Sequence, residues 1–366
     1  MLKKFIKTGN VSILNYLKLR IFEYLCNNLN NQKKLNIEIK KSNELINKIK
    51  YWKKFNGKIY LSKHYYYKNI DQYCEIKNSL YFFNFDLDTN VIKKDIDGSV
   101  VIINSNDIFK KNGIKQYENL VRSCTETVFV LYLYDNHHIV TTSVLFASLS
   151  DIIISAHPHH RYLLSNYCSY VISPLCAPIY SWSMPEILNY QKNIFNMNRG
   201  FDLGGNFNKY EQFPLRNEII SSLHKKSFKW DIKLNNLNDP DNYQYKTPAE
   251  RILEWTSYKT SLIVSTQDDI PIRFFDSMLT GSIPIVHAIL KNQIESLEGI
   301  KHIKNHICWF TEFDLIGFED VVERATKLFD SHGLSGIKER TTWAMKFHMR
   351  ESVIHEIVDK LDSIIY

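Results

Sequence analysis

The segment from Tyr258 to His287 constrains the fold of this chain more than any other part of the sequence. It contains a short apolar run, Ser261–Ser265, with the length of a buried strand. Pro271 stands where a helix can begin, because proline lacks only an amide hydrogen that has no partner in a first helical turn. Gly281 suits the left-handed residue that ends a helix, and a second apolar run follows it. The segment therefore predicts a compact β-α-β unit.

Polar residues follow the helical period within this unit. Arg273, Asp276 and Ser277 are three and four positions apart, so they share one helix face. Asp268 lies in an acidic loop eight residues before Asp276. A helix N-terminus attracts phosphate, and a carboxylate can hydrogen-bond a sugar diol. The pattern thus favours a nucleotide-binding unit, and the alternative is an ordinary β-α-β unit with a surface Arg-Asp pair.

Apolar runs alternate with helical patterns along most of the chain. The alternation is typical of doubly wound α/β domains, and prolines mark a linker over 174–198. The expected strands cover 79–85, 99–104, 128–133, 151–155, 170–173, 200–206 and 306–310, besides the two runs above. The expected helices lie near 115–124, 139–149, 159–168, 214–224, 247–257, 318–330 and 336–362.

We therefore predict an α/β protein with two Rossmann-like, doubly wound domains and a basic helical N-terminal extension. At 366 residues the chain is long enough for both cores. The predicted ranges are 1–75 for the extension, which packs on or flanks the first domain, 76–180 for the N-terminal domain, 199–345 for the C-terminal domain and 346–366 for a C-terminal helix.

The charge of the chain is concentrated at its beginning. Residues 1–60 hold 14 Lys or Arg and three Glu, a net charge of +11, whereas the whole chain carries +7. Apolar residues between Ile13 and Leu25 recur with helical spacing. This pattern is typical of a basic amphipathic helix that docks on an anionic membrane surface. The alternative is a helix packed on the first domain with solvated lysines. Nucleic acid is not expected as a partner, because no recognisable binding module accompanies the basic run.

Cysteine usage and hydropathy indicate the compartment. The six cysteines are scattered and contain no C-x-x-C pair, which is typical of reduced thiols in a cytosolic protein. The N-terminus lacks a convincing secretory signal, and no window of about 18 uninterrupted apolar residues is present. We expect a cytoplasmic protein, either soluble or peripheral on the cytoplasmic face of a membrane.

The segment 258–287 resembles the donor-binding segment of GT-B-fold glycosyltransferases, of the group 1 and exostosin-like kind. In that superfamily a pattern close to R-x-x-E-A-x-x-x-G-x-x-P-(I/V) closes the nucleotide-sugar site, and its acid contacts the ribose. Arg273, Gly281, Pro284 and Ile285 match this pattern, whereas Asp276 stands where Glu is usual. The resemblance implies a GT-B architecture with the active site between two domains.

A glycine pair lies near the start of the predicted C-terminal domain. Gly204-Gly205-Asn206 follows a short apolar stretch and precedes a helix that contains Arg216. Glycines at a strand-to-helix turn let backbone amides approach a diphosphate, and GT-B enzymes commonly have such a turn, with an Arg or Lys nearby. Gly205, Asn206 and Arg216 therefore join Asp268, Arg273, Asp276 and Ser277 as candidate donor-binding residues. The alternative is a plain turn.

Histidines cluster in the N-terminal domain. Asp135, His137 and His138 follow the 128–133 strand, and His157–His160 follow the 151–155 strand. Strand ends of a doubly wound sheet carry ligand sites, and imidazole suits general-base chemistry near neutral pH. Asp135, His137 and His138 are thus the candidate catalytic residues. The alternatives are hydrogen-bonded loop residues or a zinc site, although consecutive histidines point apart. These clusters also resemble spore-maturation (CgeB-like) glycosyltransferases.

The resemblance implies transfer of a sugar from a nucleotide-diphosphate donor to a hydroxyl of a glycan or lipid-linked glycan, as in cell-surface polysaccharide biosynthesis. No cofactor and no metal are expected. Asp135, His137 or His138 would act as base if the reaction inverts configuration, and Asp268 would contact the donor sugar if it retains configuration. Two alternatives stay open: a GT-B-fold nucleotide-sugar epimerase, and a non-catalytic protein that binds glycan or nucleic acid.

Overall fold

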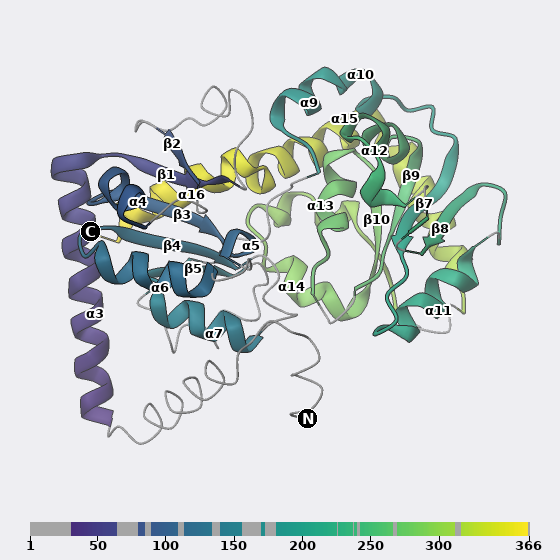
Figure 1. The fold of residues 1–366 in the computed structure, drawn as a ribbon. Helices are drawn as coiled ribbons and strands as arrows, with labels where there is room; N and C mark the ends of the chain where they lie inside the picture. Colours follow the sequence, from purple (N-terminus) through teal and green to yellow (C-terminus); the bar gives the residue numbers. More distant parts are fainter. Residues whose placement is uncertain are drawn as a thin grey trace. The chain divides into compact units, whose positions relative to one another are not determined.

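The computed structural model describes residues 31–63, 80–84, 89–108, 113–133, 140–155, 170–172, 181–224, 226–236, 238–239, 242–265, 269–311 and 316–364. The chain divides into two compact units (Figure 1). The first contains residues 1–176 and 355–366, and the second contains residues 177–354.

Six parallel strands form the sheet of the first unit, in the order β2-β1-β3-β4-β5-β6. The strands are β1 (Ile59–Ser62), β2 (Leu80–Phe83), β3 (Val100–Asn104), β4 (Val128–Leu133), β5 (Ile152–Ser155) and β6 (Tyr170–Ile172). The helices described around them are α3 (Asn31–Tyr51), the π-helix η1 (Trp52–Asn56), α4 (Thr89–Ile96), α5 (Ser105–Ile108), α6 (Gly113–Ser123) and α7 (Val140–Leu149).

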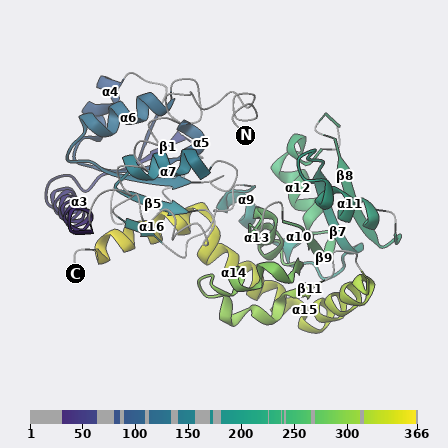
Figure 2. The ribbon, with the colours of Figure 1, turned by 90° about the horizontal axis from the view of Figure 1, so that it is seen from below.

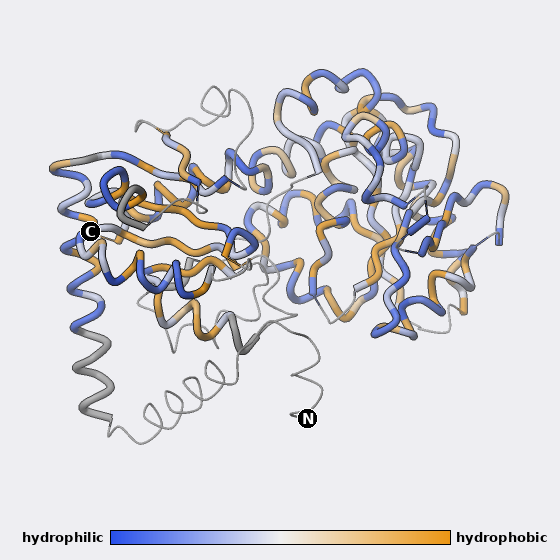
Figure 3. Tube along the Cα trace, viewed as in Figure 1, coloured by the Kyte–Doolittle hydropathy of each residue, from blue (hydrophilic) through white to orange (hydrophobic). Residues whose placement is uncertain are grey.

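Strands β2 to β6 confirm the five strands predicted for this unit, because continuous apolar runs are what a parallel sheet covered on both faces requires. The central strands are buried along their whole length, and they appear as hydrophobic segments in Figure 3. The helix expected near 159–168 lies outside the described residues.

Strand β1 was not predicted, although it is an inner strand of this sheet. It lies within the range 1–75 that we expected to be an extension, so that range also supplies part of the domain. Its four residues are too short a run to stand out from sequence, but all four are buried between β2 and β3. Helix α3 is attached to the same unit by a salt bridge from Lys48 to Asp151 at 2.9 Å.

The sheet of the second unit has five parallel strands in the order β11-β10-β9-β7-β8. Helices lie along both sides of these strands (Figure 2). The strands are β7 (Phe201–Asn208), β8 (Trp230–Asn235), β9 (Tyr258–Ile263), β10 (Ile283–His287) and β11 (Cys308–Phe310). The α-helices are α9 (Met184–Asn189), α10 (Gln191–Ile194), α11 (Pro214–Leu223), α12 (Pro248–Trp255), α13 (Ile272–Leu279), α14 (Lys291–Glu295) and α15 (Phe318–His348), and the 3-10 helices are η5 (Tyr243–Tyr245), η6 (Ala288–Leu290), η7 (Ile300–His302) and η8 (Lys304–His306). Helix α16 (Arg350–Ser363) begins in this unit, but most of it belongs to the first unit.

The predicted β-α-β unit is present as β9, α13 and β10. Gly281 has φ +78° directly after Thr280, the C-cap of α13, so the predicted left-handed helix end is confirmed. Pro271 differs slightly from the prediction, because it is the extended N-cap residue and the helix begins one position later. The fold class is confirmed: the chain is an α/β protein with two Rossmann-like units.

The predicted linker contains two helices, and the interval expected between the last two helices is a kink within a single helix. Helices α9 and α10 lie within 174–198. Helix α9 begins after Ser183, which forms a capping box with Glu186, and Pro185 fits its first turn. Near the C-terminus, the break expected between 330 and 336 falls at Gly333, whose φ of 56° interrupts α15.

Candidate functional site

The order of the second sheet defines where a ligand site is expected. The chain moves from β7 outward to β8, then returns across β7 to place β9 on the other side. Crevices at such a topological switch point, at the carboxyl ends of the strands, are the usual ligand sites of open parallel sheets. The expected ligand site is therefore formed by the segments that follow β7 and β9.

Two arginines meet at this switch point. Arg216 lies in the first turn of α11, after β7, and Arg273 lies in the first turn of α13, after β9. Both guanidinium groups contact the ring of Phe207, with Cζ at 5.4 Å and 4.7 Å from the ring centroid. Arg216 also lies 5.0 Å from the ring of Tyr210. Cation–π contacts hold the two positive charges in fixed positions.

The charges of Arg216 and Arg273 are only partly offset by nearby acids: Asp269 acts to raise the pKa of Arg216, and Arg273 acts to lower that of Asp276. Neither Arg216 nor Arg273 forms an ion pair with a carboxylate of the described residues, and Nε of Arg216 and Nη1 of Arg273 are buried without a hydrogen-bond partner there. Nη1 of Arg216 donates to the carbonyl of Asn208 at 2.8 Å. Burial, and next the charge of Arg273, lower the pKa of Arg216 to about 10. The arrangement leaves two buried donors without a described partner and places positive charge at the switch point.

Asp276 lies one helical turn after Arg273 and is 1% exposed. Its Oδ2 accepts a hydrogen bond from Oγ of Ser181 at 2.9 Å, and its Oδ1 has no partner among the described residues. Burial raises the pKa of Asp276 to about 7, although the Ser181 hydroxyl and the charges of Arg273 and Arg251 lower it. Near neutral pH this carboxyl group can therefore either donate or accept a hydrogen bond. Ser277, beside it, is also fully buried, and its Oγ has no described partner.

The glycine pair does not form the strand-to-helix turn that we expected, because Gly204 and Gly205 lie inside β7. A Cβ atom on Gly204 would be 2.1 Å from the ring of Tyr258, and one on Gly205 would be 2.5 Å from the ring of Phe207. The glycines therefore make room for aromatic rings, and the turn to α11 comes later.

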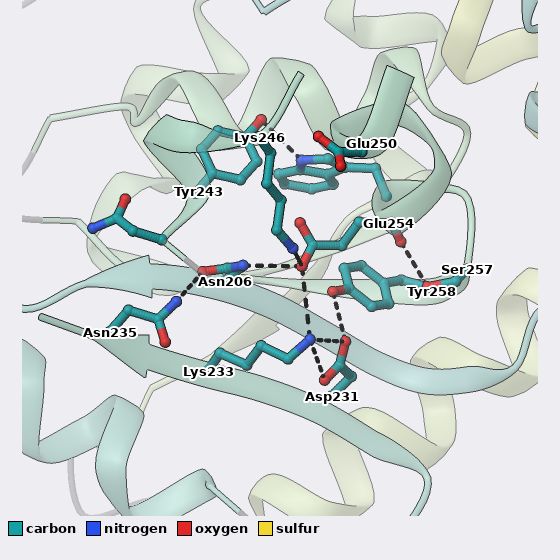
Figure 4. A network of polar contacts seen from close by, with 12 residues as sticks. Asn206, Asp231, Lys233, Asn235, Tyr243, Lys246, Glu250, Glu254, Ser257 and Tyr258 are labelled. Atoms are coloured by element: carbon teal, nitrogen blue, oxygen red, sulfur yellow. Dashed lines mark hydrogen bonds and ion pairs between the residues drawn. The ribbon is translucent and has the colours of Figure 1, made fainter. Parts of the chain in front are cut away.

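The amide of Asn206 is occupied by other side chains, as Figure 4 shows. Its Nδ2 donates to Oε1 of Glu254 at 3.0 Å, and its Oδ1 accepts from Nδ2 of Asn235 at 2.9 Å. Glu254 also accepts from Nζ of Lys246 at 2.8 Å. These contacts join β7, β8 and α12, so the geometry gives Asn206 a structural task.

The remaining candidates cannot be placed. Asp135, His137, His138 and Asp268 lie outside the described residues, as does the cluster His157–His160. Strand β4, which ends at Leu133, is the predicted strand before the first of these clusters. Within the described ranges no group of three His, Cys, Asp or Glu side chains is suited to a metal ion.

Sequence reasoning did not select Phe207 or Ser181. Phe207 is the penultimate residue of β7, and its role depends on two arginines that are 57 positions apart in the chain. Ser181 reaches Asp276 across 95 positions. A separate cavity of about 410 Å³ lies between the end of β11 and the start of α15, lined by residues that include Trp309, Phe318 and Arg324. It contains none of the switch-point residues.

No protein-family model and no curated protein matches this chain. Solved structures match it at low similarity. The N-terminal domain of trehalose-6-phosphate phosphatase from Candida albicans has 8% identity and a TM-score of 0.49, with 85% of this chain and 98% of that chain covered. The catalytic domain of starch synthase IV from Arabidopsis thaliana, bound to ADP and acarbose, has 10% identity and a TM-score of 0.42, with 75% of each chain covered. A pneumococcal O-GlcNAc transferase in complex with UDP and GlcNAc has 8% identity and a TM-score of 0.39, with 75% of this chain and 59% of that chain covered. Likeness at this level does not carry an activity from one chain to another.

Proposed function

We propose that this protein is a glycosyltransferase that moves a sugar from a nucleotide-diphosphate donor to a hydroxyl group of a glycan or glycolipid. The observation that carries the proposal is the pair Arg216 and Arg273, held over one phenyl ring at the switch point without a carboxylate partner in the described residues. Two fixed guanidinium groups suit a diphosphate, because its negative charge grows as it leaves the sugar.

The other candidate residues would bind the ribose, the acceptor hydroxyl or the donor sugar. Asp276 holds a ribose hydroxyl through Oδ1, which has no described partner. In an inverting reaction, Asp135, His137 or His138 removes the proton of the acceptor hydroxyl. In a retaining reaction, Asp268 contacts the donor sugar and no strong base is needed. The proposal includes no metal and no cofactor.

Calorimetric titration with nucleoside diphosphates tests the donor site. Arg216→Ala and Arg273→Ala should each weaken binding at least tenfold, since each removes charge-assisted hydrogen bonds. Arg122→Ala is the matched control, because Arg122 is an exposed arginine of the first unit whose ion pair within the described residues is with Glu118. Unchanged affinity in both site variants would reject the donor site. Incubation with nucleotide sugars alone tests the activity, because a changed sugar without release of nucleotide would identify an epimerase instead.

We also propose that the acceptor is reached at an anionic membrane surface. Residues 40–63 contain eight lysines and one acidic residue, Glu44. Phe55 is 63% exposed, and Nζ of Lys54 lies 4.8 Å from the centroid of its ring. Exposed aromatic rings beside lysines are typical of surfaces that contact lipid headgroups. None of the helices in the described ranges has the length and apolar character needed to cross a membrane.

Co-sedimentation with liposomes that contain phosphatidylserine tests this surface. The variant Lys53→Glu/Lys54→Glu/Phe55→Ser should pellet less than the wild type, and Lys301→Glu/Lys304→Glu, on exposed lysines of the second unit, is the control. Equal pelleting of wild type and triple variant would reject the membrane surface.

A further inference from the structure

Three consecutive helices of the second unit begin in the same way. Each of α11, α12 and α13 has a proline at its N-cap or first position and an arginine two or three residues later. The pairs are Pro214 with Arg216, Pro248 with Arg251, and Pro271 with Arg273. These helices follow β7, β8 and β9, so their first turns are at the carboxyl edge of the sheet.

Aromatic rings connect the three arginines into one cluster. The ring of Phe207 contacts Arg216 and Arg273, as described above. The ring of Tyr243, in η5, contacts Arg273 and Arg251, with Cζ at 4.9 Å and 4.8 Å from the centroid. The arginine–aromatic cluster therefore runs in the order Arg216, Phe207, Arg273, Tyr243 and Arg251.

Tyr243 is itself held in place. Its hydroxyl accepts a hydrogen bond from Nε1 of Trp255 at 3.1 Å, and it is also hydrogen-bonded to Ser181, the residue that donates to Asp276. Burial raises the pKa of this hydroxyl, so the ring stays neutral and its face remains available to cations. The ring thus has a fixed position between two guanidinium groups that come from different helices.

The three charges oppose the electrostatics of their own helices. A helix N-terminus carries partial positive charge, so arginine is disfavoured in a first turn and an acid is favoured. Neither α11 nor α13 has an acid there, and the acid of α12, Glu250, is engaged in the capping box of Thr247. Among the described residues Arg251 has no carboxylate ion pair, and its Nε is buried without a partner. The buried carboxyl group of Asp276 interacts with Arg273 and Arg251 but keeps its proton to about pH 7, so positive charge remains for an external anion to balance.

We propose that Arg251 is a third anion-binding group of the switch-point site, and that Tyr243 is a positioning residue that keeps Arg251 beside Arg273. The inference rests on the proposed function and extends it to the class of ligand. Three guanidinium groups spread over two rings fit a ligand with at least two phosphate groups, such as a nucleoside diphosphate. A monophosphate engages fewer of them.

Titration of wild type and variants with pyrophosphate and with inorganic phosphate tests the inference. Arg251→Gln should weaken pyrophosphate binding about tenfold and should lower the dependence of affinity on salt, since one charge–charge contact is lost. Its effect on phosphate binding should be smaller. Tyr243→Leu should weaken pyrophosphate binding in the same direction, whereas Tyr243→Phe, which keeps the ring, should bind like the wild type. If Arg251→Gln does not fold, Arg251→Lys replaces it, because it keeps the charge and removes the planar group.

The outcomes separate this inference from the donor site itself. Wild-type affinity in Arg251→Gln and Tyr243→Leu, together with loss of binding in Arg273→Gln, overturns the inference and leaves the proposed function standing. Wild-type affinity in Arg273→Gln overturns both. Arg122→Gln serves as the control for a general effect of removing an arginine.

Discussion

The hydroxyl of Ser181 lies 2.9 Å from Oδ2 of Asp276, and no other side chain in the described ranges hydrogen-bonds to that carboxyl group. One hydroxyl does not compensate for the burial of a carboxylate, so the proton is retained to about pH 7. The helix that carries the candidate phosphate-binding Arg273 therefore contains an acid whose charge depends on pH in the neutral range.

The first prediction concerns this pH dependence. Because the pKa of Asp276 is raised in the folded protein from 3.8 to about 7, the folded protein holds a proton that the unfolded chain has lost. Raising the pH through this window weakens the folded state, by at most about 4 kcal/mol. Asp276→Asn removes the effect. Urea unfolding at pH 5, 6, 7 and 8 should show the wild type losing stability relative to this variant.

Glu351 is also expected to make the folded protein less stable as the pH rises, because burial raises its pKa to about 7 as well. It is present in both proteins, so the difference between wild type and Asp276→Asn isolates Asp276. A difference that stays constant from pH 5 to pH 8 would contradict the assigned pKa.

The second prediction concerns the glycines of β7. Gly204→Ala should lower the free energy of unfolding by about 1–3 kcal/mol or more, because the new methyl group meets the ring of Tyr258. Gly200→Ala is the control, since a Cβ atom there meets nothing within 4 Å. Thermal unfolding of the two variants measures the difference. Equal melting temperatures would show that β7 does not need this space.

A third prediction separates structure from binding at Asn206. Asn206→Ala should destabilise the protein by about 1–3 kcal/mol, because Glu254 and Asn235 lose a buried partner. The folded fraction should bind nucleoside diphosphate like the wild type. Denaturant unfolding and calorimetric titration of the same sample check both parts, and a loss of affinity without a loss of stability would return Asn206 to the donor site.

The fourth prediction concerns the C-terminal end of α13. Arg340 is fully buried, donates to the carbonyl of Gly281 from Nε and Nη2 at 3.0 and 2.8 Å, and contacts His306 through Nη1. Burial lowers its pKa to about 9. Arg340→Met should cost about 3 kcal/mol of stability, because that carbonyl loses both of its charge-assisted bonds. Lys338→Met, on the exposed side of α15, should cost little.

The same pair of variants tests whether the contact at the C-terminal end of α13 influences ligand binding at its N-terminal end. A weaker affinity for nucleoside diphosphate is expected only in Arg340→Met, measured well below its melting temperature. If Arg340→Met is as stable as Lys338→Met, the contact with Gly281 contributes nothing to the fold.

Much of the fold follows from local sequence. Strand β4 is six consecutive apolar residues, and it agrees with the prediction at both ends, because a strand buried on both faces needs no polar alternation. Gly281 marks the end of α13 because few residues other than glycine adopt positive φ at low cost. Local patterns were weaker where a strand is short or lies at an edge. Strand β8 was missed because it is the half-exposed edge strand and alternates Asp, Lys and Asn with apolar residues.

The candidate site also has a part that local sequence predicts and a part that only the structure shows. Arg216, Arg273 and Asp276 can be selected from sequence, because their spacing from a glycine stop and from strand ends is local information. Only the tertiary structure decided that Phe207 and Tyr243 join three arginines from three helices, and that Ser181 is the partner of Asp276. Those contacts depend on the order β9-β7-β8, which brings together segments far apart in the chain. Sequence by itself determined which residues have the chemistry to bind an anion, and the strand order decided which of them lie together.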